Sequence, residues 1–540
     1  MLFRSVITPQ TNIRLIKSPI ELDNKNQLTF ASKQAQETYF KSLPYIEAND
    51  YTYQRKDGFI RYEAPYDTLL EYNYCMYQNE AYDNKWFYAF ITDLKMLNND
   101  VTGVSIKTDV WQTWMFDLEF KNSFIEREHV NDDTFGLNLV PENVELGEYT
   151  CNEHILDNHF DDVNVDFKYV VSLAVDYWNP NVDKYRPATP KKYNGIVSGA
   201  NYYSFDNETA IKNTLADLED RGQIDTVNGL FLAPSSLLTA SQTYNGVNEI
   251  ASSTTPVTYN TTINKQTTLD TYVPKNNKLK VYPYNYLLVS NNSGSSCIYR
   301  YEEFSTTNCQ FTVEECLTPG CSIRMVPLNY KNMSRFDDYG LNLGKFPICS
   351  YNVDMYTNWL TQNSINIQGL GKVTGDDLNL VSSALGSTIG ALGGMVSSNY
   401  MSSATYLFNG FAGISNALIQ KKQHELIPPE SRGNLNAGDV VTSSGKNTFH
   451  FYKMSIKKHF ATLIDDYFTM YGYQVNALKT PNITGRRYWN FVKTIGVNII
   501  AHIPQNDLQE IKALFDNGIT FWHDPSKFLD YSQTNDIIVS

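Results

Sequence analysis

The sequence predicts a mainly β protein with α+β parts, arranged in several lobes. Aromatic residues make up 14% of the chain and include 38 tyrosines, a composition that favours strands over helical bundles. Polar and apolar residues alternate in the first quarter of the chain, whereas helical periodicity is strong only near its C-terminal end. At 540 residues, the chain is long enough for two to four lobes whose folding does not depend on disulfides or metals.

The strongest strand signal lies in residues 85–121. The stretch KWFYAFITDLKMLNND predicts a strand that ends in an Asn-Asn-Asp turn, and the next segment would pair with it as an antiparallel hairpin. In VTGVSIKTDVWQTWMFDLEF, polar and apolar residues alternate, which predicts long strands with one buried face. That face would hold Val104, Ile106, Val110, Trp114, Phe116, Leu118 and Phe120.

The middle of the chain has a different composition. Residues 230–330 are rich in Ser, Thr and Asn, as in ASSTTPVTYNTTINKQTTLDTYV, and contain short β segments such as KVYPYNYLLV. This composition predicts an all-β middle lobe, or partly ordered loops on such a lobe.

Helix signals return after residue 450. MSIKKHFATLIDDYFTMYGY predicts a helix that ends at Gly472, and NDLQEIKALFDNG predicts another, with Asn506 as its N-cap and Asn517-Gly518 as its end. The strand-like stretches VNIIAHI and ITFWH flank the second helix, so we expect an α+β C-terminal part. The apolar stripes would be Ile456, Phe460, Leu463, Tyr467 and Met470 in the first helix, and Leu508, Ile511 and Phe515 in the second.

One segment is unlike the rest of this polar, acidic chain. Residues 378–420 contain no charged side chain and no proline, although 19% of the whole chain is charged. Read as a helix, the segment has a small residue at every fourth position, which lets helix backbones approach closely in lipid. That ridge comprises Ser382, Gly386, Gly390, Gly394, Ser398 and Ser402.

The charge-free segment is not a standard membrane-spanning helix. Ser, Thr and Gly interrupt it throughout, so it has no run of about 20 predominantly apolar residues. In water, each interior glycine costs a helix roughly 1 kcal/mol relative to alanine. The pattern fits a hairpin that assembles with copies of itself and faces lipid with its apolar side. A flexible connector, or a buried hairpin inside an oligomer, remains an equally open interpretation.

Candidate catalytic and metal-binding residues give weak signals. His154 and His159 lie close to Asp157, Asp161 and Asp162, but their spacing is not that of a helical zinc site, so we favour a solvated loop. The pairs Glu314-Glu315 and Asp465-Asp466 are adjacent in sequence and do not face each other as a glycosidase pair must. The charged stretch FIEREHV (124–130) favours structural or inter-subunit ion pairing. We therefore predict no enzyme activity, no cofactor and no metal.

Charge and cysteine usage exclude further classes. A formal net charge of -14 argues against a nucleic-acid binder held by electrostatics, and the N-terminus has no secretory signal. The seven cysteines are odd in number, and the spacing of Cys309, Cys316 and Cys321 differs from that of zinc knuckles. We expect idle thiols made in a reducing cytosol.

Several segments together resemble one family, the tail knob proteins of small short-tailed phages of Gram-positive bacteria (the phi-29-like Picovirinae). The similar segments are YQNEAYDNKWFYAFITDL, DVWQTWMFDLEFKNSFIEREHV, VYPYNY and NDLQEIKALFDNGITFWH, in the same order as in the family. The charge-free segment lies where the family has its long hydrophobic loop, and Ile427-Pro428-Pro429 follows it in both. Residues 150–350 match poorly.

The resemblance implies a virion structural protein, a homohexameric tail-tube subunit at the distal end of the tail, made in the host cytoplasm. Residues 1–150 and 446–540 would build the tube wall, and the middle lobe (151–350) would extend the tube. The loop at 365–445 would plug the lumen and then penetrate the host membrane during genome ejection. Its partners would be other tail proteins (the lower collar and a distal cell-wall-degrading protein), the host membrane, and phage DNA passing without specific binding.

The residues assigned to the plug are the apolar and small side chains of the charge-free segment. They are Leu378, Val381, Leu385, Gly386, Ile389, Gly390, Leu392, Gly394, Val396, Tyr406, Leu407, Phe408, Phe411, Ile414, Leu418 and Ile419. Two other functions stay open at this point. A cell-wall-degrading tail enzyme would need a carboxylate pair in a cleft, and a receptor-binding protein would use the aromatic-rich and Asn-rich middle lobe.

Overall fold

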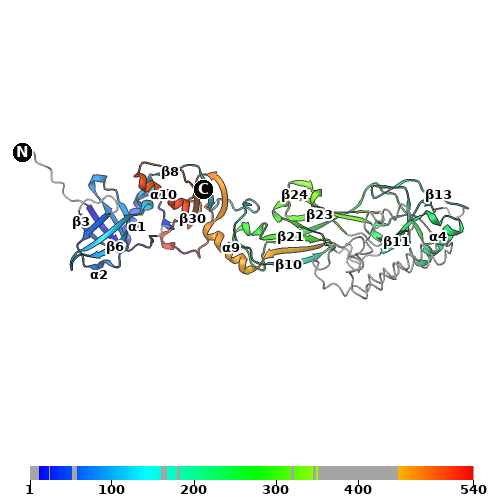
Figure 1. Ribbon diagram of the computed structural model, residues 1–540, viewed down its shortest axis with the longest axis horizontal. Coiled ribbons are helices and arrows are strands. Elements are labelled where there is room, and N and C mark those ends of the chain that lie inside the picture. The colour runs from blue at the N-terminus through cyan, green and yellow to red at the C-terminus, as the bar shows by residue number, and fades with distance from the viewer. Residues whose placement is uncertain are drawn as a thin grey trace, which may run out of the picture. The chain divides into compact units, whose positions relative to one another are not determined.

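The computed structural model describes residues 11–22, 25–51, 58–157, 159, 167–178, 183–292, 294–317, 321–343, 348–350 and 448–538. The chain divides into two compact units (Figure 1). Unit 1 comprises residues 1–146, 272–279 and 458–540, and unit 2 comprises residues 147–271 and 280–457. Strands dominate over helices, which confirms the predicted mainly β class.

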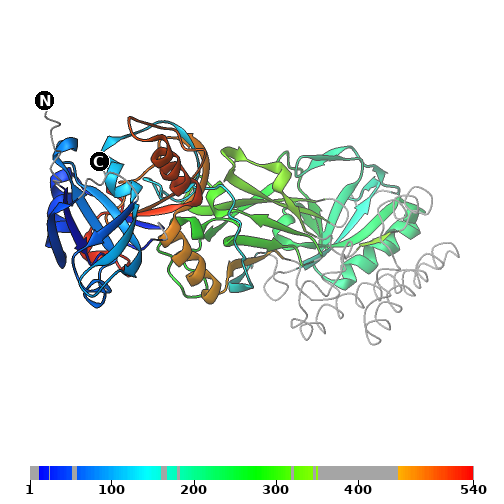
Figure 2. The same cartoon turned by 60° about the vertical axis from the view of Figure 1, so that its left-hand side comes forward.

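The first sheet of unit 1 has six antiparallel strands in the order β3-β1-β5-β6-β7-β4. It curls, as the blue strands in Figure 2 show, so that residues of nearly all its strands share one core. The middle strand β5 is buried on both faces, because Cys75 and Tyr77 join this core while Tyr74 and Met76 pack on the opposite side with Phe40. The elements are β1 (Thr11–Ile16), α1 (Lys33–Ser42), β3 (Tyr45–Tyr51), β4 (Gly58–Tyr62), α2 (Tyr66–Leu69), β5 (Tyr74–Gln78), β6 (Phe87–Met96) and β7 (Thr102–Thr108).

The predicted hairpin is β6–β7, and its turn is stabilised by Asn98, whose Oδ1 accepts from the backbone N–H of Val101 at 2.8 Å. The prediction that the strand pattern continues to residue 120 is wrong. After Thr108, the Asp109 carboxylate accepts from the N–H groups of Trp111 and Gln112 and caps α3 (Val110–Trp114). An Asp cap therefore ends the strand, and β8 (Leu118–Phe120) begins only after a helical turn.

The second sheet of unit 1 combines strands from both ends of the chain, in the order β2-β32-β30-β9-β29. The helix α10 packs against β30 (Figure 1). It buries Ile511 and Phe515 in a core shared with Trp111. The elements are β2 (Asn26–Leu28), β9 (Ser123–Glu128), α9 (Lys458–Tyr471), β29 (Tyr473–Lys479), β30 (Trp489–Ile495), α10 (Gln505–Asn517) and β32 (Ile519–Trp522), with β31 (Ile499–Ala501) paired to β8 nearby.

Both C-terminal helices exist, but two details of their prediction are wrong. In α9 the buried residues are Ala461, Ile464, Asp465 and Phe468, and Leu463 of the predicted stripe is 56% exposed. The stripe is displaced because a buried carboxylate, Asp465, lies on the inner face. In α10 the stripe is correct, but the N-cap is Pro504 rather than Asn506. Gly472 and Gly518 end the two helices with positive φ, as predicted.

The described residues of unit 2 form mainly antiparallel sheets, three of which have four or more strands. The six-stranded sheet contains β11 (Phe167–Leu173), β16 (Asn201–Phe205), β17 (Val227–Pro234), β18 (Ala240–Tyr244), β19 (Val247–Ile250) and β27 (Ile348–Ser350), and α4 (Glu208–Asp220) packs against it. The four-stranded sheet contains β10 (Tyr149–Leu156), β21 (Asn285–Ser290), β22 (Ser296–Tyr299) and β28 (His450–Ile456).

The five-stranded sheet contains β20 (Val257–Asn264), β23 (Asn308–Cys316), β24 (Ser322–Tyr330), β25 (Met333–Arg335) and β26 (Leu341–Asn342). The described part of unit 2 also contains two small hairpins, β12 (Val175–Asp176) with β13 (Arg186–Pro187) and β14 (Lys191–Tyr193) with β15 (Ile196–Ser198).

Candidate functional site

Every residue assigned to the plug, from Leu378 to Ile419, lies outside the described residues. The structure does describe the two strands that lead into and out of this region, and both belong to unit 2. The chain leaves through β27, the edge strand of the six-stranded sheet, which pairs with β17. It returns into β28, which lies between β10 and β21 in the four-stranded sheet. The base of the loop at β28 is therefore a candidate site.

The first residues after the loop are firmly held. The Thr448 hydroxyl donates to the backbone carbonyl of Asp157, and the N–H of Asp157 donates to the carbonyl of Phe449 at 3.0 Å. Phe449 and Phe451 are fully buried, and Phe451 packs on Phe311 with ring centroids 5.6 Å apart. These contacts and the hydrogen bonds of β28 on both sides make the base a rigid attachment for the chain.

Three aromatic side chains stack on β10 and β28. The His154 ring lies parallel to that of Tyr452, 4.5 Å away, and its Nε2 is 3.0 Å from Nδ1 of His450. Such a bond needs one ring nitrogen to donate and the other to accept, so at least one of the two imidazoles is neutral. The expectation of a solvated loop is wrong for His154, which lies within β10, although its side chain is exposed.

His159 pairs with a carboxylate that has no exposed surface. Its Nε2 lies 3.1 Å from Oε1 of Glu315, and its ring stacks on Tyr259, whose hydroxyl donates to Asp157 at 2.5 Å. The hydrogen bond with Glu315 raises the pKa of His159, against the opposing effect of burial. Burial and, next, the charge of Asp157 raise the pKa of Tyr259. The pairing with Glu315 stabilises the protonated, charged form of His159. This arrangement does not provide a nucleophile or a general base.

The adjacent carboxylates do not converge on a common point. Glu315 faces His159, whereas Glu314 accepts from Arg335, so the two residues point to opposite sides of β23. Asp465 is fully buried, whereas Asp466 forms a surface pair with Lys275 at 3.2 Å. Neither pair has the facing geometry of a glycosidase.

The charged stretch 124–130 serves structural pairing within the chain, which confirms the preferred interpretation. Arg127 donates to the carbonyl of Gly472 at 2.7 Å and pairs with Glu142, and Glu128 pairs with Lys479. His129 is buried between two backbone groups: its Nδ1 accepts from Phe491 N–H at 2.8 Å, and its Nε2 lies 3.0 Å from the carbonyl of Thr469. Burial, followed by the charge of Arg486, lowers the pKa of His129 to about 3.

Sequence reasoning missed a set of carboxylates in unit 1 that hold the segment 272–279. Asp465 accepts four hydrogen bonds from this segment, from the Tyr272 hydroxyl, two backbone N–H groups and the Asn276 side chain. Asp133 accepts from the Asn277 N–H at 2.9 Å, and Glu142 pairs with Lys278. Isolated acidic residues in sequence give no sign of such convergence, and Asp465 lies outside the apolar stripe predicted for its helix.

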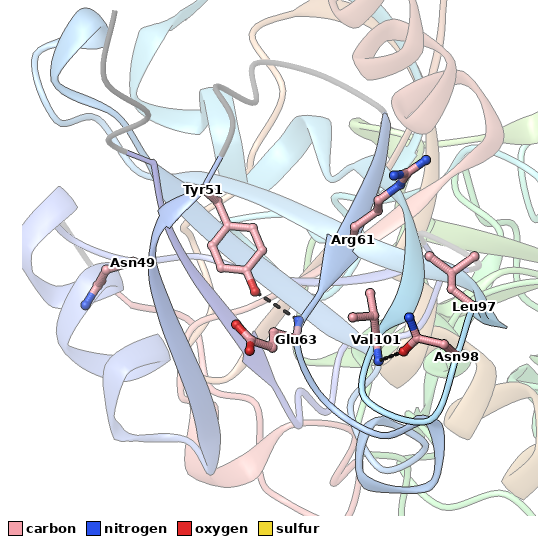
Figure 3. Close-up of a pocket in the computed structure, with 7 residues that line it drawn as sticks. All are labelled: Asn49, Tyr51, Arg61, Glu63, Leu97, Asn98 and Val101. Atoms are coloured by element: carbon pink, nitrogen blue, oxygen red, sulfur yellow. Dashed lines mark hydrogen bonds between the residues drawn. The ribbon is translucent and has the colours of Figure 1, made fainter.

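A hollow of about 740 Å³ lies on unit 1, where the edge strands β3 and β4 approach each other (Figure 3). Across it, the Tyr51 hydroxyl accepts from the Glu63 backbone N–H at 3.0 Å. Its charged residues, Arg61 and Glu63, are exposed, and the hollow has no acid–base pair of the kind catalysis requires. The lining residues are Asn49, Tyr51, Arg61, Glu63, Leu97, Asn98 and Val101.

Within the described part of the chain, no group of three or more His, Cys, Asp or Glu side chains is placed to hold a metal ion. The side chains of Cys309 and Cys321 are buried. Among the same residues, no helix combines the length and the apolar composition needed to cross a membrane.

Comparison with known proteins decides the family. Residues 243–536, more than half of the chain, match the family described as the C-terminal domain of tail knob protein gp9 of Bacillus phage phi29. The chain belongs to the phi29 gp9 tail knob family. Residues 9–119 also match the N-terminus of caudoviral major tail proteins. The family resemblance seen in the sequence is thereby confirmed.

Relatives of this tail knob family match along nearly the whole length. The tail knob protein gp9 of Bacillus phage phi29 is 27% identical over 98% of both chains. The gp9 of Bacillus phage PZA is 26% identical, covering 95% of this chain and 96% of the relative. These relatives are structural tail knob proteins and not enzymes, so this chain is a structural component of the virion tail that associates with other tail proteins.

A solved structure shares the fold. The tail knob protein gp12 of bacteriophage C1 superposes with a TM-score of 0.59 at 15% identity, covering 98% of this chain and all of that one. This likeness extends through residues 150–350, where sequence similarity was weakest.

Proposed function

We propose that six copies of this chain form the distal tube of the tail, through which DNA leaves the virion. Residues 1–150 and 446–540 build the wall of the tube, and residues 151–350 extend it. The loop at 365–445 plugs the lumen and then penetrates the host membrane. The neighbours of the ring are the lower collar and the distal cell-wall-degrading protein, and DNA passes without specific binding. The chain is made in the host cytoplasm before it joins the virion.

One observation carries the proposal: the charge-free segment is inserted between two strands of one unit. Because β27 and β28 each belong to a hydrogen-bonded sheet, the chain is tethered on both sides of the insertion. A membrane-active segment must be retained by the tail when it leaves the lumen, and a double tether provides this. The assembly of residues 11–146 with 458–538 in unit 1 further supports a wall built from both ends of the chain.

The distribution of charge in the sequence supports the proposed role as a conduit for DNA. The net charge of -14 repels phosphate, so DNA can slide without forming contacts that would hold it. The absence of charge in residues 378–420 suits lipid, where a charged side chain costs about 3 kcal/mol on insertion scales.

The test is dye leakage from anionic lipid vesicles by the purified chain, at neutral and acidic pH. The comparison is a variant in which a Gly/Ser linker of equal length replaces residues 378–420, with native mass spectrometry to count copies in both. Leakage that disappears with the replacement, while six copies remain together, supports the proposal. Equal leakage from both, or no leakage from either, would contradict a membrane role for the segment.

A single substitution gives a finer test. Gly390→Glu places a carboxylate in the small-residue ridge, whereas Gly390→Ala keeps the ridge small and uncharged. We expect the Glu variant to lose at least about tenfold in leakage rate, and the Ala variant to stay close to the wild type. Phage with Gly390→Glu that inject DNA normally would argue strongly against the proposal.

A further inference from the structure

The chain that returns from the loop is attached to the end of β10. The backbone N–H of Asp157 donates to the carbonyl of Phe449 at 3.0 Å, and the Asp157 carbonyl accepts from the Thr448 hydroxyl. Thr448 and Phe449 are the first described residues after the charge-free segment. The contacts that hold Asp157 in place therefore also hold the C-terminal attachment of the loop.

Asp157 is held in turn by the five-stranded sheet. Its Oδ2 accepts from the Tyr259 hydroxyl of β20 at 2.5 Å, and its Oδ1 accepts from the backbone N–H of His159 at 3.3 Å. The rings of His159 and Tyr259 are stacked, with centroids 3.8 Å apart. The position of the end of β10 thus depends on where the His159 side chain lies.

A buried carboxylate fixes the His159 side chain. Glu315 of β23 has no exposed surface, and its Oε1 lies 3.1 Å from Nε2 of His159. Among the described residues, its Oε2 has no hydrogen-bond partner. Burial of a carboxylate is costly unless a cation compensates it, so the charge of Glu315 depends on His159. The His159 side chain is 35% exposed, so protons from the solvent reach it. We call Asp157, His159, Tyr259 and Glu315 the latch.

The surroundings of His159 favour its charged form. The titratable groups that face it are Glu315 from β23, Asp157 from the end of β10 and Tyr259 from β20, and all three are acids. The hydrogen bond with Glu315 raises the pKa of His159 against the effect of burial, and the charge of Asp157 acts in the same direction as Glu315.

The sign of the pH dependence follows from this direction. An unfolded histidine has a pKa of about 6.5, and the folded value lies above it. The pairing therefore contributes its full stability below about pH 6.5 and loses it as the pH rises through the raised pKa.

We propose that the latch is a proton-dependent attachment for the loop. A charged His159 fixes the end of β10 and, through it, Thr448 and Phe449, and a neutral His159 loosens them. The purpose of the latch rests on the proposed function, in which the loop changes its environment while the tail retains it. Within that function, the latch keeps the C-terminal attachment of the loop firm in mildly acidic surroundings and weakens it in alkaline ones.

The test is hydrogen exchange of the Asp157 amide in the purified chain at pH 6 and pH 9, expressed as protection relative to an unstructured chain at the same pH. We expect protection to fall by about tenfold at pH 9, the effect of losing one charge-assisted hydrogen bond. The internal control is the Ile456 amide at the far end of β28, which donates to the Tyr284 carbonyl at 3.1 Å and should not respond.

Two variants separate His159 from other histidines. His159→Gln cannot become charged, so its Asp157 amide should be equally weakly protected at both pH values. The matched control is His154→Gln, which removes an exposed histidine of β10 itself and should behave as the wild type does. As a second measurement, the imidazole titration of His159 followed by NMR should move to lower pH in Glu315→Gln, a substitution of nearly equal shape.

The other outcomes overturn the inference. Equal protection at pH 6 and pH 9 in the wild type means that no proton controls the attachment. An unchanged decline in His159→Gln, or its loss in His154→Gln, assigns the pH dependence to another group. A parallel decline at Ile456 shows a general effect on unit 2.

These results are independent of vesicle leakage. A failed latch in a chain that causes leakage overturns only this inference. A pH-dependent latch in a chain that causes no leakage supports the local inference and contradicts only the proposed membrane role.

Discussion

Removal of the Asp465 carboxylate should loosen the segment 272–279 within unit 1. The side chain has no exposed surface and accepts from the Tyr272 hydroxyl at 2.7 Å, the Lys275 N–H at 2.7 Å, the Asn276 N–H at 3.1 Å and the Asn276 side chain at 2.7 Å. Asp465→Ala deprives all four donors of their acceptor.

The expected magnitude follows from these four bonds. A hydrogen bond contributes about 1 kcal/mol net, and more when the acceptor is charged, so four bonds correspond to roughly 4 kcal/mol of local stability. Water can reach part of the vacated space, so we expect a loss of at least about 3 kcal/mol. Since about 1.4 kcal/mol is a factor of ten, the opening equilibrium should increase more than about 100-fold.

Amide hydrogen exchange at Lys275 and Asn276 measures this opening directly and does not require two-state unfolding of a chain with two units. Asp466→Ala is the matched control, because it removes the neighbouring carboxylate of the same helix, whose pair with Lys275 is 45–62% exposed. Surface pairs contribute about 0–1 kcal/mol, so exchange should change less than about fivefold. If the two variants exchange alike, the carboxylate does not hold the segment and the reasoning fails.

Two further predictions concern unit 1. Folded His129 has a pKa of about 3, below the value of about 6.5 for an unfolded histidine, so acidification protonates the unfolded state first and stability falls from about pH 6.5 downwards. The loss at pH 5 should be about 2 kcal/mol by urea unfolding; His129→Asn should reduce this slope, and an unchanged slope would exclude His129 as its source. At Gly472 a Cβ would lie 2.2 Å from the Glu128 carbonyl oxygen, whereas at Gly496, with a similar φ, nothing lies within 4 Å. Gly472→Ala should therefore cost roughly 3 kcal/mol or more and Gly496→Ala roughly 1 kcal/mol, and equal costs would contradict a steric origin.

The local sequence pattern was sufficient to predict those helices, strands and turns that depend only on neighbouring residues. The β6–β7 hairpin, the α10 stripe and the glycines that end both C-terminal helices were all visible in short windows. The predictions failed where a single side chain departs from the local pattern. Asp109 caps a helix within an alternating stretch, and the carboxylate of Asp465 lies on the buried face of α9.

The sequence did not predict which residues, distant along the chain, would contact one another in the fold. His154 meets His450 only because β10 and β28 are paired, and the carboxylates that hold residues 272–279 come from positions 133, 142 and 465. No periodicity encodes such contacts, because they depend on how strands from separate parts of the chain are paired. The assignment of residues 378–420 as the plug remains a prediction.

The parallel pairing of β2 with β32 has a consequence for synthesis of the protein. Residues 26–28 leave the ribosome long before their partners at 520–522. The second sheet of unit 1 therefore cannot close until residues 520–522 have been made, and the charge-free segment is made before them. A chain truncated anywhere before residue 519 lacks β32, and the core shared by Trp489 and Trp522 stays incomplete. Only chains that extend through β32 can present a completed unit 1, which favours their incorporation into a tail over that of shorter fragments.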